Sequence, residues 1–311
     1  MKTKVLFPRF LAFPRLLAPA LAIAAFATLP LGPALAASAP APRVANVVVE
    51  AVQMPAWLER DGGSQPLYPG MELRDNDRLK TGNGSRLLLR TRDGSAVKLG
   101  ANATFRLGGA EQRPGNVFAA TMQVLEGAFR FTTDSLARYR GKREITIQVA
   151  NVTAGIRGTD LWGKSAPNRE IVCLIEGRIE VAPQNEAPIA MDQPLQFYVR
   201  ENGRSQPVGL VAAAQLREWA TETDIADGRG AVRRGGQWKL TLTTADTQKA
   251  ALEVYDRVRE AGYAAEIRPV KEGDKSAYAV RLANLPSRAE AEALAASLKG
   301  QLGLDELKVS R

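Results

Sequence analysis

Residues 238–242, Trp-Lys-Leu-Thr-Leu, are matched forty residues later by residues 278–282, Tyr-Ala-Val-Arg-Leu. In both stretches apolar and polar residues alternate, which is the pattern of a half-buried strand. Each stretch is followed by a helical spacing of apolar residues and then by a further strand, over 245–261 and 264–270 in the first half and over 287–302 and 307–309 in the second. This duplicated order predicts an α+β domain of the ferredoxin-like βαββαβ type over 237–311.

The same alternation predicts a polar sheet face. If both helices cover one face, the apolar residues of the two strands point into the core. The other face then carries Lys239, Thr241, Thr243, Ala279, Arg281 and Ala283. Small and polar residues on an open sheet can admit a sugar chain, with hydrogen bonds from Arg and Thr. The alternative is a solvated sheet face that has no ligand.

The segment 237–311 resembles the SPOR domain, a small peptidoglycan-binding module. The resemblance rests on Trp238-x-Leu-x-Leu242, on Arg257 to Ala265 at the end of the first helix, on Tyr278-x-Val-Arg-Leu282 and on Pro286 to Glu292. It implies that the polar face meets glycan strands that lack stem peptides. The predicted glycan-binding residues are therefore Lys239, Thr241, Thr243 and Arg281.

Residues 47–204 show a different pattern, with a period near two that is broken often by Gly, Asn and Asp. Asp93-Gly94-Ser95 is a hairpin signal between the apolar stretches 86–90 and 96–99. Glu126-Gly127 and Glu176-Gly177 are predicted as further turns. About ten short strands with these spacings predict an all-β domain over 47–204, either a sandwich or a β-roll.

Residues 47–183 resemble the FecR domain. The matching pieces are Tyr68 to Leu73, Asn76 to Gly82, Asp93-Gly94-Ser95, Ala154 to Leu161 and Glu176 to Val181. The resemblance implies an all-β periplasmic module for interaction or sensing, without known catalysis. FecR regulators of iron uptake carry a cytoplasmic anti-sigma segment ahead of a membrane span. With 15 residues before its first apolar run, this chain is not expected to hold a sigma factor in that way.

Turn chemistry explains most residues of these motifs. Tight turns or a positive φ are predicted for Gly70, Gly82, Gly94, Gly127, Gly158 and Gly177. Asp93 and Asp160 are predicted to brace turns through their side chains, and Thr159 belongs to the same Arg-Gly-Thr-Asp element. An ion pair between Arg157 and Asp160 is one structural interpretation of that element. A binding role for Arg157 is the alternative.

The first 36 residues have the features of an export signal. Four positive charges in residues 1–15 precede an apolar stretch, Leu16 to Leu29, that is short for a membrane span of ~20 residues. Ala34-Leu35-Ala36 is a cleavage site of the A-x-A type. We expect cleavage after Ala36, a flexible leader over 37–46 and a periplasmic protein whose mature chain has no membrane span. A retained anchor is the alternative.

The composition limits the chemistry of the chain. There is no histidine and one cysteine, Cys173, which excludes histidine-based triads, histidine metal sites and an internal disulfide. We predict no cofactor and no metal. Cys173 lies in the apolar run 171–175, which predicts a buried packing thiol; the alternative is a reactive thiol. The net charge of +9 is unevenly placed, with four basic residues and no acid in the first 36, and the mild excess that remains does not predict a nucleic-acid partner.

Together these patterns predict a non-catalytic periplasmic protein of two domains, connected by a helix and linker over 205–236. Residues 237–311 would grip peptidoglycan glycan strands, and the FecR-like domain would meet an envelope protein or a signal. The SPOR resemblance further implies a place in cell division. One alternative is an envelope signalling sensor that acts through a separate membrane partner. Another is a carboxylate-pair glycan hydrolase that uses acids such as Glu126, Glu144 and Glu176.

Overall fold

The structure is a computed structural model that describes residues 46–133, 141–272 and 275–311. The predicted signal peptide over 1–36 and its cleavage after Ala36 lie outside the described residues. Among the described helices, none combines the length and the apolar composition that crossing a membrane requires.

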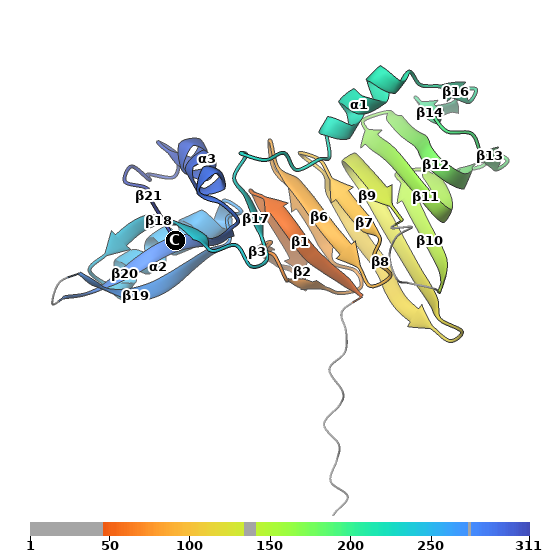
Figure 1. The fold of residues 1–311 in the computed structure, drawn as a ribbon. Coiled ribbons are helices and arrows are strands. Elements are labelled where there is room, and N and C mark those ends of the chain that lie inside the picture. The colour runs from red at the N-terminus through yellow and green to blue at the C-terminus, as the bar shows by residue number, and fades with distance from the viewer. Residues whose placement is uncertain (1–45, 134–140, 273–274) are drawn as a thin grey trace, which may run out of the picture. The chain divides into compact units, whose positions relative to one another are not determined.

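The first part of the chain is built from strands that join into one 17-stranded sheet (Figure 1). Among the described residues, the strand pairs of this sheet are antiparallel apart from β9 and β10, which run parallel. One helix, α1 (Ala213–Thr221), lies between the last two strands of this series. The strands are β1 (Val47–Gln53), β2 (Ala56–Arg60), β3 (Gly63–Pro66), β4 (Glu72–Leu73), β5 (Arg78–Thr81), β6 (Arg86–Thr91), β7 (Ala96–Leu99), β8 (Thr104–Arg113), β9 (Val117–Thr132), β10 (Lys142–Val149), β11 (Val152–Ala166), β12 (Arg169–Pro183), β13 (Ile189–Met191), β14 (Gln196–Glu201), β15 (Arg204–Ser205), β16 (Gly209–Leu210) and β17 (Ala231–Arg233).

The core of this part follows the period of two that the sequence shows. Leu87 and Leu89 on β6 are buried, whereas Arg86 and Arg90 on either side of them are partly exposed. Four phenylalanines are fully buried in this part and follow Trp162 and Tyr198 in size: Phe105, Phe118, Phe129 and Phe131. Burial of such rings is the main stabilising term for a sheet of this kind.

Two predicted turns are wrong, because β9 and β12 continue through them. Gly127 lies inside β9 with φ 88°, at a register shift between β8 and β9. Gly177 lies inside β12 with φ 93°, opposite a register shift in β11. A glycine at positive φ inside a ladder is the mark of a β-bulge, which bends a strand without ending it. The two Glu-Gly pairs therefore mark bends inside strands of 16 and 15 residues.

The last part of the chain forms the second sheet. Its elements follow in the order β18 (Trp238–Ala245), α2 (Gln248–Glu260), β19 (Ala265–Glu272), β20 (Lys275–Leu285), α3 (Arg288–Leu298) and β21 (Lys308–Ser310). The sheet is antiparallel with the order β19-β20-β18-β21. Thr247 caps α2 and Ser287 caps α3, each by accepting a hydrogen bond from the backbone N–H three residues on.

The connecting segment is more ordered than a linker. Residues 231–233, inside the predicted linker, form β17 and pair with Ala51, Val52 and Gln53 of β1. The backbone N–H of Ala56 donates to the carbonyl of Gly262 at 3.1 Å, and Trp57 Nε1 donates to the carbonyl of Glu260 at 3.1 Å. These two hydrogen bonds therefore hold the end of α2 against β2.

Candidate functional site

A row of four polar residues crosses the second sheet. Thr241 on β18 is paired with Lys308 on β21 and with Arg281 on β20, and Arg281 is paired with Glu266 on β19. Leu240 and Leu282, one position away from this row, are fully buried in the core. Since successive side chains of a strand point to opposite faces, the row Lys308–Thr241–Arg281–Glu266 lies on the face away from that core.

Glu266 organises the charges of this face. Arg281 Nε donates to its Oε1 at 2.7 Å, and Arg268 Nη2 donates to its Oε2 at 2.8 Å. Burial acts to raise the pKa of Glu266, but the hydrogen bonds from Arg268 and Arg281 outweigh it and the pKa is lowered. The carboxylate therefore stays ionised and holds Arg281 in place, while the terminal nitrogens of Arg281 make no hydrogen bond within the described part of the chain.

Not all of the predicted glycan-binding residues lie on the polar face of the second sheet. Thr241 and Arg281 are direct neighbours, and Lys239 is paired with Ser310 on the edge strand. Thr243 is paired with Val280, a fully buried core residue, because a bulge follows Thr241. Its placement beside Thr241 is therefore wrong, and Thr244 takes the corresponding position opposite Ala279. Glu266 and Arg268 also lie on this face and are not among the predicted binding residues, although the alternation in Ala265-Glu-Ile-Arg is a signal that indicates both.

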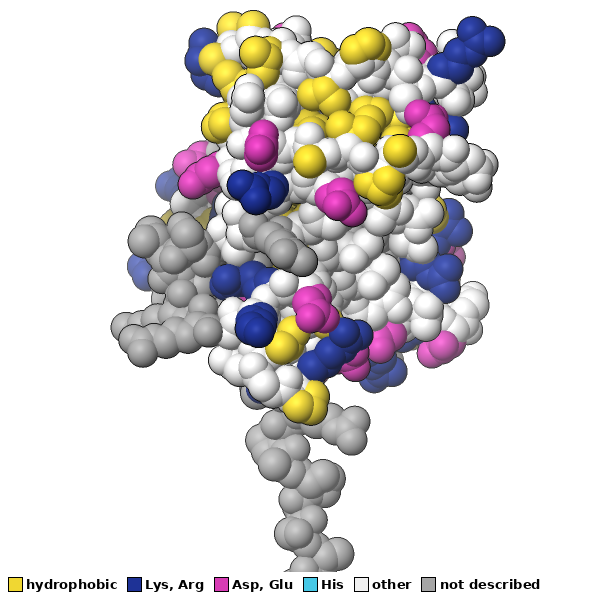
Figure 2. All heavy atoms as spheres, turned by 90° about the vertical axis from the view of Figure 1, so that its right-hand side faces the viewer, with side chains coloured by type: hydrophobic (Ala, Val, Ile, Leu, Met, Phe, Trp, Pro, Cys, Tyr) yellow, Lys and Arg dark blue, Asp and Glu magenta, His cyan; other side chains and the backbone are white. Residues whose placement is uncertain are grey.

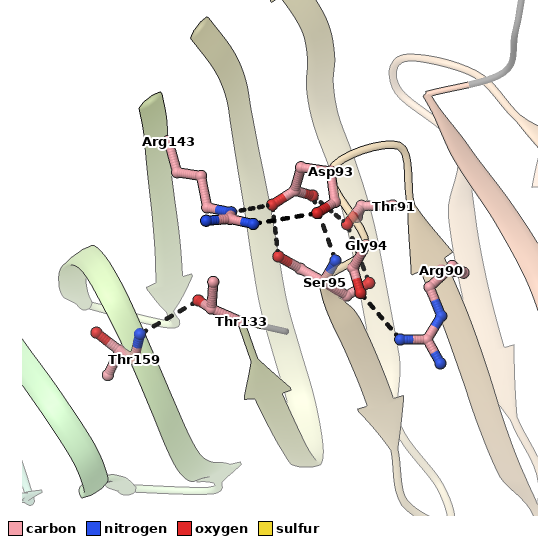
Figure 3. Close-up of polar contacts among 8 residues, drawn as sticks. All are labelled: Arg90, Thr91, Asp93, Gly94, Ser95, Thr133, Arg143 and Thr159. Atoms are coloured by element: carbon pink, nitrogen blue, oxygen red, sulfur yellow. Dashed lines mark hydrogen bonds and ion pairs between the residues drawn. The ribbon is translucent and has the colours of Figure 1, made fainter. Parts of the chain in front are cut away.

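The motif residues of the first domain form a buried polar cluster (Figure 3). Asp93 is fully buried, and its carboxylate accepts hydrogen bonds from Thr91 Oγ1, Ser95 Oγ and Arg143 Nε at 2.5, 2.6 and 2.6 Å. Arg143 belongs to β10, whereas Asp93 lies in the turn between β6 and β7. The prediction that Asp93 braces a turn is confirmed, and the same carboxylate also ties that turn to a strand 50 residues away.

A second cluster surrounds the Arg-Gly-Thr-Asp element. Asp160 accepts two hydrogen bonds from Arg130, from Nε at 2.9 Å and from Nη2 at 2.6 Å. This bidentate geometry gives Asp160 a structural partner on β9; the side chain of Arg157 lies outside the described residues. Thr159 Oγ1 donates to the carbonyl of Arg178 at 3.0 Å. A Cβ on Gly177 would lie 2.3 Å from the carbonyl oxygen of Gly158, so these strands need a glycine there.

The glycine predictions are mostly confirmed. A positive φ is found at Gly70, Gly94, Gly127, Gly158 and Gly177. Gly82 differs, because its requirement is space: a Cβ would lie 2.8 Å from Pro55 Cγ.

Two of the candidate acids of a hydrolase, Glu126 and Glu144, are far apart along the sheet. Glu144 is paired with Ala119 on β9, and Glu126 lies seven residues further along that strand. At about 3.3 Å per residue the backbone positions of Glu126 and Glu144 are separated by roughly 23 Å, whereas paired glycosidase carboxylates stand about 5 to 10 Å apart. Within the described ranges, no group of three or more Cys, Asp or Glu side chains is arranged to hold a metal ion.

Cys173 is buried beside Trp162, as the packing prediction requires. Burial, with a smaller contribution from the negative charge of Asp160, raises the pKa of its thiol to about 12. At pH 8 about one thiol in 10⁴ is then ionised. We expect the native chain to resist a thiol-specific colorimetric reagent at pH 8, and the urea-unfolded chain to react stoichiometrically. Rapid reaction of the native thiol would contradict this account.

Comparisons with known proteins identify both parts of the chain. The model of the FecR protein family matches residues 77–180, and the SPOR domain model matches residues 235–306. The chain therefore contains a FecR domain and a SPOR domain, and both resemblances are confirmed. No curated protein matches the chain.

Two crystal structures of a Parabacteroides distasonis protein assigned as an anti-sigma factor, at 1.65 and 2.50 Å resolution, are similar to this chain. Each has 14% identity and a TM-score of 0.37, and the match covers 64% of this chain and 96% of the other. At that TM-score the likeness carries no functional argument.

Proposed function

We propose that this chain, with its FecR domain and its SPOR domain, is a non-catalytic protein of the bacterial cell envelope that binds peptidoglycan glycan strands. SPOR domains bind peptidoglycan, and this family membership supports an envelope location. The order β19-β20-β18-β21 supports the ferredoxin-like arrangement for this domain. Export to the periplasm after cleavage at Ala36 and a role in cell division are parts of the same proposal.

The observation that carries the proposal is the polar row on the second sheet. Lys308, Thr241 and Arg281 offer hydrogen-bond donors in adjacent positions, and Glu266 offers an acceptor at the end of the row. Four adjacent strands span roughly 14 Å between the outer two, so an extended polymer can touch several of these groups together. A glycan strand bound here would replace water on a face where Glu266 already holds Arg268 and Arg281 in position.

The FecR domain would act as the interaction or sensing module. Its polar clusters around Asp93 and Asp160 are occupied by hydrogen bonds inside the domain, so they support a rigid scaffold. Figure 2 shows apolar side chains gathered at the top of one face, in the region of α1, β14 and β16. Leu210 in that region is 69% exposed. Such a surface supports contact with an envelope partner.

Arg281→Ala tests the assignment of the face. We expect the variant to bind denuded sacculi about tenfold more weakly than the wild type, because it loses a charged donor and leaves Glu266 without that partner. The measurement is depletion of the purified chain from the supernatant by sedimented sacculi. Arg288→Ala is the matched control, since Arg288 is an exposed arginine of α3 that pairs with Glu292. Equal binding by both variants would remove this face from the glycan site.

A further inference from the structure

A cavity of about 240 Å³ lies where the end of α2 and the start of β19 meet β3 and the residues that follow it. Its walls are fixed by hydrogen bonds. Ala56 and Trp57 bond to the carbonyls of Gly262 and Glu260, and the backbone N–H of Ala264 donates to Met54 Sδ at 3.4 Å. Gly262 has φ 86°, and a Cβ there would lie 2.6 Å from the Trp57 ring. The residues around the cavity are therefore held in place by these contacts, and its lining comes from both domains.

The lining combines aromatic rings with planar polar groups. Tyr68, beyond β3, is 48% exposed and is the more exposed of the two tyrosine rings that line the cavity. Arg259 is already ordered: its guanidinium lies 5.2 Å from the centre of the Tyr255 ring, and its Nη1 donates to Tyr255 Oη at 3.2 Å. The polar and aromatic lining groups are Gln65, Tyr68, Tyr255, Arg259, Glu266 and Asn284.

This set of groups favours a neutral ring with an apolar face and a hydroxylated edge. Phenol rings supply flat apolar surface for the face, and the amides with Arg259 supply donors and acceptors for the edge. An anion would be repelled by the ionised carboxylate of Glu266. A purely apolar ligand would displace water from Gln65 and Asn284 without replacing its hydrogen bonds. Ligand sites also form preferentially where two domains meet. Sugar rings have the required chemistry.

The cavity adjoins the polar face of the second sheet. Glu266 lines the cavity and is also the last residue of the row Lys308–Thr241–Arg281–Glu266. A chain of sugars lying across that row therefore runs into the cavity at its β19 end. Resting on the proposed function, we infer that the cavity binds one sugar unit of the same glycan strand. The region ahead of the FecR match, through Tyr68 and Gln65, then contributes directly to the glycan site.

Tyr68→Ala tests the inference in the full chain. The probe is a peptide-free tetrasaccharide of alternating N-acetylglucosamine and N-acetylmuramic acid, in which the neutral N-acetylglucosamine ring is the unit that fits the cavity. Affinity is measured by calorimetry. We expect about five- to tenfold weaker binding, because one stacking surface is lost, and a smaller loss for Gln65→Ala. Leu125→Ala is the matched control, since Leu125 on β9 is similarly exposed at 42% and does not line the cavity. It should bind like the wild type.

The outcomes separate this inference from the proposed function. If Tyr68→Ala and Gln65→Ala bind as tightly as Leu125→Ala while Arg281→Ala is weakened, the cavity is not a sugar site and the sheet face remains one. If the wild-type chain binds neither the tetrasaccharide nor denuded sacculi, both proposals are overturned. Circular dichroism of each variant confirms that an affinity loss reflects the site, because Tyr68 is half exposed and its truncation leaves the core unchanged.

Discussion

Replacing Asp93 by alanine is expected to destabilise the chain by about 3–5 kcal/mol. The substitution removes the acceptor of Thr91, Ser95 and Arg143 together. Arg143, whose side chain is 17% exposed, then keeps its charge without this carboxylate. Breaking a buried ion pair by removing one partner costs this much because the groups that bonded to the carboxylate stay desolvated after this acceptor is lost. The measurement is the guanidinium unfolding midpoint, followed by tryptophan fluorescence.

The control for this prediction is an acid of an exposed pair in the same sheet. Glu111 pairs with Arg113 on the surface, and both side chains are more than half exposed. Glu111→Ala should leave the unfolding midpoint where it is, since exposed pairs contribute little. If Asp93→Ala and Glu111→Ala shift the unfolding midpoint equally, the hydrogen bonds of Asp93 do not stabilise the contact between β10 and the β6–β7 turn.

Glu290→Gln should release the segment that joins the two domains. Glu290 is buried, and its carboxylate accepts from the backbone N–H groups of Gly228, Gly230 and Ala231 at 2.7, 2.6 and 3.0 Å. An amide of the same shape turns an NH₂ group toward at least one of these donors. With buried donors left unsatisfied, we expect a loss of about 2–3 kcal/mol and faster amide hydrogen exchange over 228–231.

Glu292→Gln, two residues along the same helix, provides the comparison. Its side chain is 55% exposed and pairs with Arg288, so hydrogen exchange over 228–231 should stay as slow as in the wild type. If amide hydrogen exchange over 228–231 were unchanged in Glu290→Gln, the pairing of β17 with β1 would be sufficient to hold the connecting segment, and the contact with α3 would not be required.

The sequence predicted local features of the second domain well. Alternation identified β18 and β20, and the helix predicted over 287–302 starts within one residue of α3, whose N-cap is Ser287. The tertiary role of Glu290 could not be predicted from its neighbours in the sequence. As the third helical residue after a Ser cap it predicts a capping box, and the cap itself is present, yet its carboxylate binds a segment 60 residues away. Tertiary partners of a buried acid leave no local trace in a sequence.

The bends in strands were harder to predict. Glu-Gly pairs at 126–127 and 176–177 match the composition of turns, and a bulge uses the same positive φ as a turn. The bulge after Thr241 has no glycine at all, which is why Thr243 was placed on the wrong side. Strand β17 is three residues long, too short for a period to be recognised. The cavity escaped prediction because its walls come from two domains.

The proposed function requires the polar row of the SPOR domain to bind glycan strands that lack stem peptides. Sedimentation of the purified wild-type chain with denuded and with peptide-bearing sacculi, at equal glycan mass, tests it most directly. The account predicts strong depletion by denuded sacculi and clearly weaker depletion by peptide-bearing ones, since peptides obstruct access to the sheet. Equal depletion by both, or none by either, would contradict it.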